Sequence, residues 1–227
     1  MNTPRKSENL LINGLIRIAG YSSILFVLLI LFFLLREGLP ALANTPLKDL
    51  LGTRWYPIEG YYGILPLILG SLLITIAATL IALPFGIGAA VYLSEVAPPW
   101  IRDILKPVIE ILAGIPSVVL GFIGILVFVP FLRKLLDIPT GLTAFTGAIL
   151  LGLISIPTIV SVAEDALNTV PNSYRQASLA LGATRWQTIW DVTLPAAKSG
   201  VLTAVMLGIG RSLGETMAVM MVTGNAP

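Results

Sequence analysis

Long runs without a charged residue constrain this chain more than any other feature of its sequence. Residues 18–35 form an uncharged run of 18, and residues 60–94 form one of 35. Because about 20 apolar residues in a helix cross a bilayer, runs of this length predict membrane-spanning helices. We therefore expect an all-α membrane protein, a polytopic helical bundle. The pattern predicts five spans, at about 18–36, 62–93, 110–132, 140–164 and 200–224.

The small number of charged and reactive side chains excludes most soluble and enzymatic classes. Only 11% of the residues are charged, against about 25% in soluble domains. The sequence contains no Cys and no His, which removes disulfides, thiolate and imidazole catalysis and nearly all zinc or haem sites. It also lacks the GxxxxGKS or GxxxxGKT phosphate loop, so any nucleotide chemistry belongs to a partner. We expect no cofactor and no enzyme activity in this chain.

The first apolar run admits two interpretations. Arg5 and Lys6 lie ahead of it near the amino terminus, and the sequence 41–43 resembles a signal-peptide cleavage site. However, the run is longer than a usual signal core, and Arg36 and Glu37 interrupt it before that site. These features favour an uncleaved span. The segment 36–61 then forms a connector whose Trp and Tyr residues suit a membrane–water interface.

Three prolines within or at the edge of the later apolar runs predict bent helices: Pro84, Pro116 and Pro157. In lipid, such helix breakers are tolerated where neighbouring helices cover the freed backbone groups. Pro116 and Pro157 are each followed by a small polar residue, Ser117 and Thr158. This pattern is typical of broken helices around a transport path. Ordinary kinks without a transport role are the alternative.

The polar segment 165–199 is expected to leave the membrane and fold as two short helices. Asn172 or Ser173 is expected to cap the first helix, and Gly182 to end it in the left-handed conformation. Thr184 is expected to cap the second helix, which Pro195 ends or bends. An amphipathic face is expected to pack against the membrane domain or the lipid surface. That face consists of Trp186, Ile189 and Trp190.

The fifth expected span carries two opposite charges one turn apart, Arg211 and Glu215. At about 1.5 Å per residue, Arg211 lies roughly 16 Å beyond Gly200, near the middle of a core of about 30 Å. A charge at this depth is costly alone, so we expect an ion pair between the two. The guanidinium matches the oxygens of an oxyanion and predicts a place in an anion pathway. A purely structural ion pair is the alternative.

Small residues spaced four apart on the same span predict close packing against other helices, because they allow backbones to approach. There are two such stripes. One comprises Ala204, Gly208 and Ser212, and the other comprises Gly210 and Gly214.

The distribution of basic residues favours a cytoplasmic amino terminus. With five spans, the side of the membrane that holds the amino terminus carries eight of them: Arg5, Lys6, Arg17, Arg102, Lys106, Arg175, Arg185 and Lys198. The other side carries five: Arg36, Lys48, Arg54, Arg133 and Lys134. The connector 36–61 is then extracytoplasmic, and the loop 165–199 is cytoplasmic.

The loop resembles the EAA loop of ABC importer permeases. That pattern reads Glu-Ala-Ala, three residues, Gly, nine residues, then Ile-x-Leu-Pro. The matching residues here are Gln176, Ala177, Ser178, Gly182, Val192, Leu194 and Pro195. Gln176 departs from the usual Glu, which removes the acid from that position, and Ser178 and Val192 are common variants. The resemblance implies that an ATPase subunit docks on residues 173–195.

Two further stretches are similar to the C-type permease subunit of phosphate-specific ABC importers. They are ILAGIPSVV at 111–119 and GRSLGETMAV at 210–219. The resemblance implies the type I importer permease fold, which has six spans, so a sixth span is missing from this sequence. It also implies four partners: an A-type permease subunit, two cytoplasmic ATPase subunits and an extracytoplasmic phosphate-binding protein.

The expected function is therefore ATP-driven import of inorganic phosphate across the cytoplasmic membrane, with Arg211 and Glu215 in the substrate pathway. Within the same class, the alternatives are importers of molybdate, sulfate or phosphonate. From other classes, the alternatives are an ATP-independent anion transporter or channel, and a membrane scaffold without transport activity.

Overall fold

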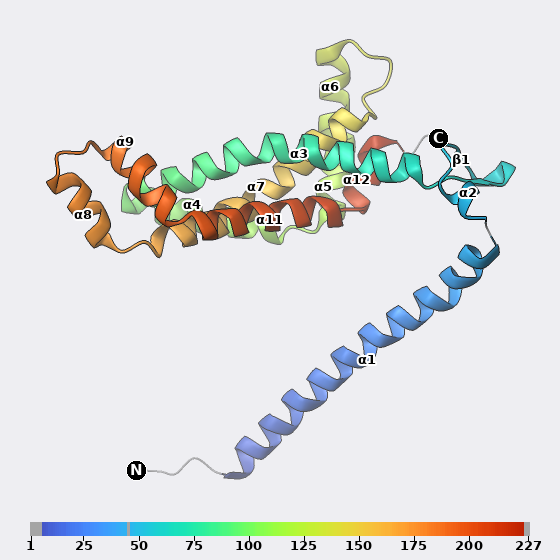
Figure 1. The fold of residues 1–227 in the computed structure, drawn as a ribbon, viewed down its shortest axis with the longest axis horizontal. Coiled ribbons are helices and arrows are strands. Elements are labelled where there is room, and N and C mark those ends of the chain that lie inside the picture. The colour runs from blue at the N-terminus through green and yellow to red at the C-terminus, as the bar shows by residue number, and fades with distance from the viewer. Residues whose placement is uncertain (1–5, 45, 225–227) are drawn as a thin grey trace. The chain divides into compact units, whose positions relative to one another are not determined.

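The computed structural model describes residues 6–44 and 46–224, which fall into two units, residues 1–66 and 67–227. Unit 1 begins with the long helix α1 (Lys6–Asn44; Figure 1). α1 continues through Arg36 and Pro40, so it extends beyond both ends of the span expected at 18–36. The remaining elements of unit 1 are α2 (Leu47–Leu50), β1 (Trp55–Tyr56), the 3-10 turn η1 (Pro57–Glu59) and β2 (Tyr61–Tyr62).

The two short strands are a small departure from an all-helical chain. β1 and β2 pair antiparallel, with Trp55 opposite Tyr62 and Tyr56 opposite Tyr61. The Trp55 and Tyr62 rings meet edge to face at 6.4 Å between centroids, a favourable arrangement for aromatic pairs. The aromatic residues of the connector therefore hold each other in a hairpin.

Every regular element in the described part of unit 2 is helical. The first half comprises α3 (Leu65–Val91), η2 (Tyr92–Val96), α4 (Pro99–Gly114), α5 (Ser117–Ile123), η3 (Gly124–Phe128) and α6 (Val129–Leu136). The second half comprises α7 (Ala144–Asn168), α8 (Asn172–Ala180), α9 (Arg185–Gln187), η4 (Thr188–Thr193), α10 (Leu194–Ala196), α11 (Lys198–Gly214) and α12 (Met217–Thr223). The segments η2, η3 and η4 are π-helical turns.

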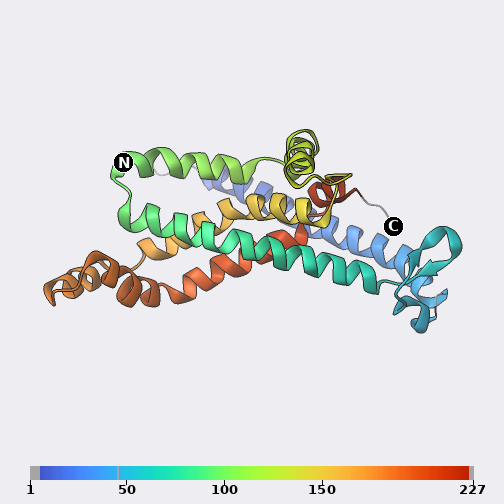
Figure 2. The ribbon, with the colours of Figure 1, turned by 90° about the horizontal axis from the view of Figure 1, so that it is seen from above.

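α7 is the helix around which unit 2 packs. It contacts α4, α11 and α12, and much of its length is buried. Figures 1 and 2 show α3, α4, α7 and α11 running alongside one another. Thr143 caps α7 by accepting a hydrogen bond from the Thr146 amide at 3.2 Å, which fixes where the helix begins.

Glycines on two neighbouring helices make room for one large side chain of α7. A Cβ at Gly86 of α3 would lie 2.8 Å from Ile159, and a Cβ at Gly208 of α11 would lie 2.5 Å from it. Ile159 is 1% exposed between them. Ala204, Gly208 and Ser212 are all buried, and the Ser212 hydroxyl meets that of Ser155 at 2.8 Å. The first small-residue stripe is therefore a packing face, as predicted.

The second stripe does not pack within this chain. A Cβ at Gly210 or Gly214 would meet nothing within 4 Å, and both residues are exposed among the residues described. The two stripes lie on different sides of α11, because residues 208 and 210 are separated by about 200° around a helix of 3.6 residues per turn.

The span expected at 110–132 is two helices rather than one. α4 ends at Gly114, and Ile115 is extended with φ −66° and ψ 130°. This is the conformation that a following proline imposes, and Pro116 follows. Both views show residues 117–136 crossing the direction of α3, α7 and α11 (Figure 2). In contrast, α3 and α7 continue as helices through Pro84 and Pro157.

The span expected at 200–224 is also broken. α11 ends at Gly214, Glu215 is extended with ψ 114°, and α12 begins at Met217. Four helices among the described residues are long and apolar enough to cross a membrane: Ile12–Pro40, Leu65–Val96, Ser117–Leu136 and Ala144–Asn168. A fifth is obtained if Arg185–Ala196 and Lys198–Gly214, which meet at 74°, form one bent span.

Candidate coupling loop and substrate pathway

One side of α8 is exposed. Gln176 and Ala177 are exposed, as are Leu179 and Ala180 on the following turn. Leu181, directly after the helix, is 90% exposed. Such apolar exposure on a short helix is typical of a surface that a partner covers.

The end of α8 is fixed by backbone geometry. Gly182 has φ +86°, the left-handed conformation predicted for it. The amide of Gly182 bonds the Leu179 carbonyl at 3.0 Å, and the amide of Ala183 bonds the Ser178 carbonyl at 3.2 Å. These two bonds form a Schellman motif, which turns the chain sharply away from the helix.

Capping of the two short helices follows the prediction only in part. Thr184 caps α9 with a full capping box, in which Gln187 accepts from the Thr184 amide at 2.8 Å. The cap expected from Asn172 or Ser173 is wrong, because the residue that precedes α8 is Pro171 and both side chains lie inside the helix. Proline fixes the backbone φ before the first turn without a side-chain bond.

The segment after Gly182 turns back onto α8 and α3. The Ser178 and Thr188 hydroxyls meet at 3.0 Å and join α8 to η4. Ile189 is buried, as expected, but Trp186 and Trp190 are 63% and 64% exposed. With α3 these two rings border an apolar groove of about 830 Å³.

Leu194 and Pro195 lie where this segment bends. Leu194 packs against the hydrophobic core and Pro195 is exposed. The π-turn η4 ends at Thr193, two residues before Pro195, whose ring nitrogen has no hydrogen to donate to the Asp191 carbonyl. The chain then bends by 74° at Ala197 into α11.

An ion pair fastens α8 to η2, the π-helical turn that follows α3. Arg175 Nη2 lies 2.6 Å from Glu95 Oε1, and Arg175 Nε donates to both Glu95 oxygens at 3.1 Å. The two side chains are only 18% and 9% exposed. Arg175 also donates to the Leu167 and Val170 carbonyls, which close the C-terminal end of α7. A cation that satisfies free carbonyls at a helix end is favourable there.

A second group of charges joins α4 to α7. Lys106 Nζ lies 2.7 Å from Glu164 Oε2 and 2.9 Å from Asp165 Oδ1. Glu164 is 2% exposed and accepts a further bond from Asn168. The hydrogen bonds to Asp165 and Glu164, in that order, raise the pKa of the Lys106 ammonium above its ordinary value. Lys106 therefore carries its charge at every physiological pH.

These charges and their neighbours form one connected set of side chains, which we call the polar network. Ser94 donates to Asn168 at 3.0 Å and approaches Glu95 at 3.4 Å, so it links the two ion pairs. The network comprises Ser94, Glu95, Lys106, Glu164, Asp165, Asn168 and Arg175. No sequence pattern predicted this network. Its one signal was that Glu95 and Glu164 each end a long uncharged run.

The helix breaks and Arg211 come together at a second location. Arg211 Nη1 donates to Thr158 Oγ1 at 3.0 Å, and Arg211 Nη2 donates to the Ala113 carbonyl at 3.1 Å. Thr158 follows Pro157 in α7, and Ala113 is at the end of α4 before Pro116. Arg211 thus joins α11 to both proline-bearing stretches. Its Nε is buried and has no hydrogen-bond partner among the residues that the structure describes.

The expected ion pair between Arg211 and Glu215 is wrong. Both residues lie in the described part of the chain, and no salt bridge joins them there. α11 ends at Gly214, so Glu215 is extended and no longer occupies the next turn of the helix. Glu215 is half-buried beside the break, and its amide bonds the Arg211 carbonyl at 3.1 Å.

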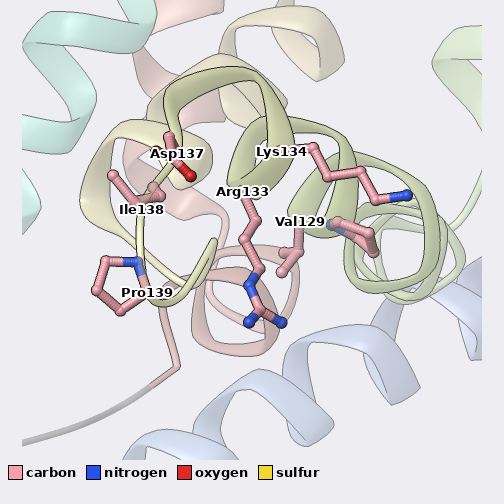
Figure 3. Close-up of a pocket in the computed structure, with 7 residues that line it drawn as sticks. Val129, Arg133, Lys134, Asp137, Ile138 and Pro139 are labelled. Atoms are coloured by element: carbon pink, nitrogen blue, oxygen red, sulfur yellow. The ribbon is translucent and has the colours of Figure 1, made fainter.

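Another cavity lies between α6 and the turn that follows it. It has a volume of about 670 Å³ and is bordered by Arg133, Lys134 and Asp137. Figure 3 shows these three side chains pointing to different sides. Because its charged groups do not converge on one point, we assign no ligand to this cavity.

Residues 82–227 match the family described as "Binding-protein-dependent transport system inner membrane component". The Bacillus subtilis "Probable ABC transporter permease protein YqgH" is 48% identical over 183 residues, covering 80% of this chain and 59% of that protein. The Pasteurella multocida "Phosphate transport system permease protein PstC" is 37% identical over 191 residues, covering 76% and 60%. The chain thus spans about three-fifths of the length of these curated relatives.

A solved structure agrees in fold. A chain of the inward-facing MetNI methionine ABC transporter matches with a TM-score of 0.57 at 22% identity, over 66% of this chain and 72% of that chain. The expected architecture, a helical bundle of the ABC importer permease kind, is therefore confirmed. The chain is a multi-pass membrane protein. It belongs to the family of binding-protein-dependent transport system inner membrane components.

Proposed function

We propose that this chain is the permease subunit of an ATP-driven importer that moves inorganic phosphate into the cytoplasm. The observation that carries the proposal is the similarity to PstC proteins, whose names specify phosphate transport. Those of Pasteurella multocida and Xylella fastidiosa are both 37% identical to this chain. Family membership supports the wider statement that the chain is a membrane component of a binding-protein-dependent system. In the proposal, separate subunits hydrolyse the ATP.

The exposed helix α8 is proposed as the docking site for a cytoplasmic ATPase subunit. It carries Gln176 and Ala177 on an exposed surface, and Ser178 joins it to Thr188. Gly182 ends the helix, and the segment that follows leads to Leu194, which packs against the core, and to Pro195. Docking transmits movement only if its free energy differs between the inward-open and outward-open states. The proposed assembly contains two ATPase subunits, an A-type permease subunit and an extracytoplasmic phosphate-binding protein. It places the amino terminus and residues 165–199 in the cytoplasm.

Arg211 is proposed to line the phosphate pathway, with Glu215 beside it. Its guanidinium lies where two helix breaks and Thr158 meet, and its buried Nε has no acceptor within residues 6–44 and 46–224. A donor of this kind is available to an anion oxygen, and a guanidinium stays protonated in an apolar bundle. Pro116 contributes by leaving the backbone between α4 and α5 outside a helix, whereas Pro84 and Pro157 lie within the continuous helices α3 and α7.

The test is uptake of radiolabelled phosphate into vesicles that contain this protein assembled with the four partner subunits. Uptake is expected only with ATP on the cytoplasmic side, and only when the protein is present. Phosphate movement without ATP would contradict the proposal and favour an ATP-independent transporter or channel. Failure of the ATPase to co-purify with the protein would contradict the docking assignment for α8.

A further inference from the structure

α4 is held in place by polar contacts rather than by buried side chains. None of its residues is buried, although Ile109 packs against the hydrophobic core from its edge. Near its beginning, Arg102 donates to the Leu93 carbonyl at 2.6 Å and the Ser94 carbonyl at 2.6 Å. Lys106, one turn later, bonds Glu164 and Asp165 of α7.

The far end of α4 is held by Arg211. Its Nη2 donates to the Ala113 carbonyl. This carbonyl lies in the last turn of α4, where no amide of the same helix is available to donate to it. Lys106 and Ala113 are separated by about 10 Å along the helix axis, at 1.5 Å per residue. α4 therefore lies between the polar network and the Arg211 guanidinium, with a polar contact to each.

The polar network reaches α8 through one side chain. Arg175 places three hydrogen bonds on Glu95, and Glu95 is joined through Ser94 and Asn168 to Glu164, the partner of Lys106. Glu95 lies in the π-helical turn η2, and such turns are frequent at functional sites. A guanidinium that bonds both oxygens of a carboxylate fixes orientation as well as distance.

We propose that Arg175 and Lys106 are positioning residues that make α8 and α4 move as one body. A displacement of α8 is then passed along α4 to the Ala113 carbonyl and changes how Arg211 is held. The proposal rests on the proposed function, because it assigns ATPase docking to α8 and the anion pathway to Arg211. It adds the physical connection between the two sites.

The connection between α8 and α4 requires that the side chains of the polar network are held in a single arrangement. Most of the Arg175 guanidinium is removed from water, and its donors are occupied by Glu95 and by two carbonyls of the α7 terminus. A buried pair of this kind contributes little net stability but specifies a unique arrangement in well-studied cases. Replacing both partners together leaves no unpaired buried charge, so the double variant keeps the fold while it loses the connection.

The first test measures how much phosphate is moved for each ATP hydrolysed. The variants are Lys106→Met and the double variant Glu95→Gln with Arg175→Met, and Lys134→Met on α6 is the matched control. We expect ATPase co-purification and thermal stability of the double variant close to those of the parent. The phosphate-to-ATP ratio is expected to fall about 2- to 30-fold in Lys106→Met and in the double variant, and to stay unchanged in Lys134→Met.

The second test measures the connection itself. The sequence has no Cys, so single cysteines at Ile104 on α4 and Ser173 on α8, both exposed, accept spin labels without competing sites in this chain. The chain is labelled before it is assembled with its partners. Pulsed electron paramagnetic resonance on the assembled complex gives the distance between the labels. We expect one narrow distance that is the same with and without ATP. In the double variant, the distribution is expected to broaden and to shift when ATP binds.

Two results would overturn the proposal. One is a parent complex in which the distance changes with ATP as much as in the double variant. The other is a double variant with a normal phosphate-to-ATP ratio. Failure of the proposed function is a different outcome, because the parent protein itself would then bind no ATPase or move no phosphate.

Discussion

Exchanging the charges of Arg211 and Glu215 is expected to stop phosphate movement without preventing assembly. In the structure, Arg211 bonds Thr158 and the Ala113 carbonyl and makes no ion pair with Glu215. The variant Arg211→Glu with Glu215→Arg therefore restores no native contact. It moves the cation beyond the end of α11 and places a carboxylate where the guanidinium donated to Ala113.

The size of the effect follows from Coulomb's law. At 4 Å and an effective dielectric constant of 20, two unit charges interact by about 4 kcal/mol. The exchange replaces attraction of that size with repulsion for an anion at the Arg211 position. Because each 1.4 kcal/mol changes a rate by about tenfold, the repulsion alone slows passage by about three orders of magnitude.

Phosphate uptake by the assembled complex is the assay, and two single variants serve as controls. Arg211→Gln keeps amide donors for Ala113 but removes the charge, so we expect assembly with strongly reduced uptake. Glu215→Gln removes no observed ion pair, so we expect normal assembly. Near-parental uptake by the exchanged variant would refute the pathway role and leave Arg211 as a structural residue.

The other predictions concern the coupling loop, the helix packing and the polar network. Gly182→Val is expected to weaken ATPase association about 5- to 30-fold in a co-purification titration, because a side chain at φ +86° costs about 1–2 kcal/mol. No steric contact changes, since a Cβ at Gly182 meets nothing within 4 Å. Gly182→Asn is the control that tolerates this φ, and unchanged association of Gly182→Val would contradict the docking assignment. Gly208→Ala is expected to lower the unfolding free energy by about 1–3 kcal/mol because its Cβ collides with Ile159. Gly210→Ala, whose Cβ meets nothing within 4 Å, is not expected to lower it, and equal melting temperatures of the two variants would refute this packing. The pKa of Lys106 is raised in the folded protein, so its contribution to the unfolding free energy is complete below the ordinary lysine pKa of about 10.4. That contribution is lost as the pH rises through the higher pKa of the folded state. The melting-temperature difference between the parent and Lys106→Met should therefore be constant between about pH 7 and pH 10 and shrink above it, and a decrease already between pH 7 and 9 would contradict the contacts described.

Local rules predicted the features that depend on neighbouring residues. The long apolar runs became helices because backbone groups in lipid must bond within the segment. Gly182 and Thr184 adopted their predicted roles because both are set by the backbone within three residues. The buried stripe of Ala204, Gly208 and Ser212 followed from helical spacing alone.

Features that depend on distant partners were not predictable in the same way. A charged residue one turn from another suggests an ion pair, but the helix ends between Arg211 and Glu215. The partners of Arg211 lie 53 and 98 residues away, and Glu95 lies 80 residues from Arg175. Hydropathy also could not separate α4 from α5, because Ile115 and Pro116 are as apolar as the run they interrupt.

Competition between oxyanions tests the central claim most directly. The complete complex, with its binding protein and ATP, is given labelled phosphate together with an excess of unlabelled molybdate, sulfate or a phosphonate. We predict that unlabelled phosphate suppresses uptake of the label and that the other three oxyanions do not. ATP-driven uptake of one of those oxyanions in place of phosphate would contradict the assignment of this chain to phosphate transport.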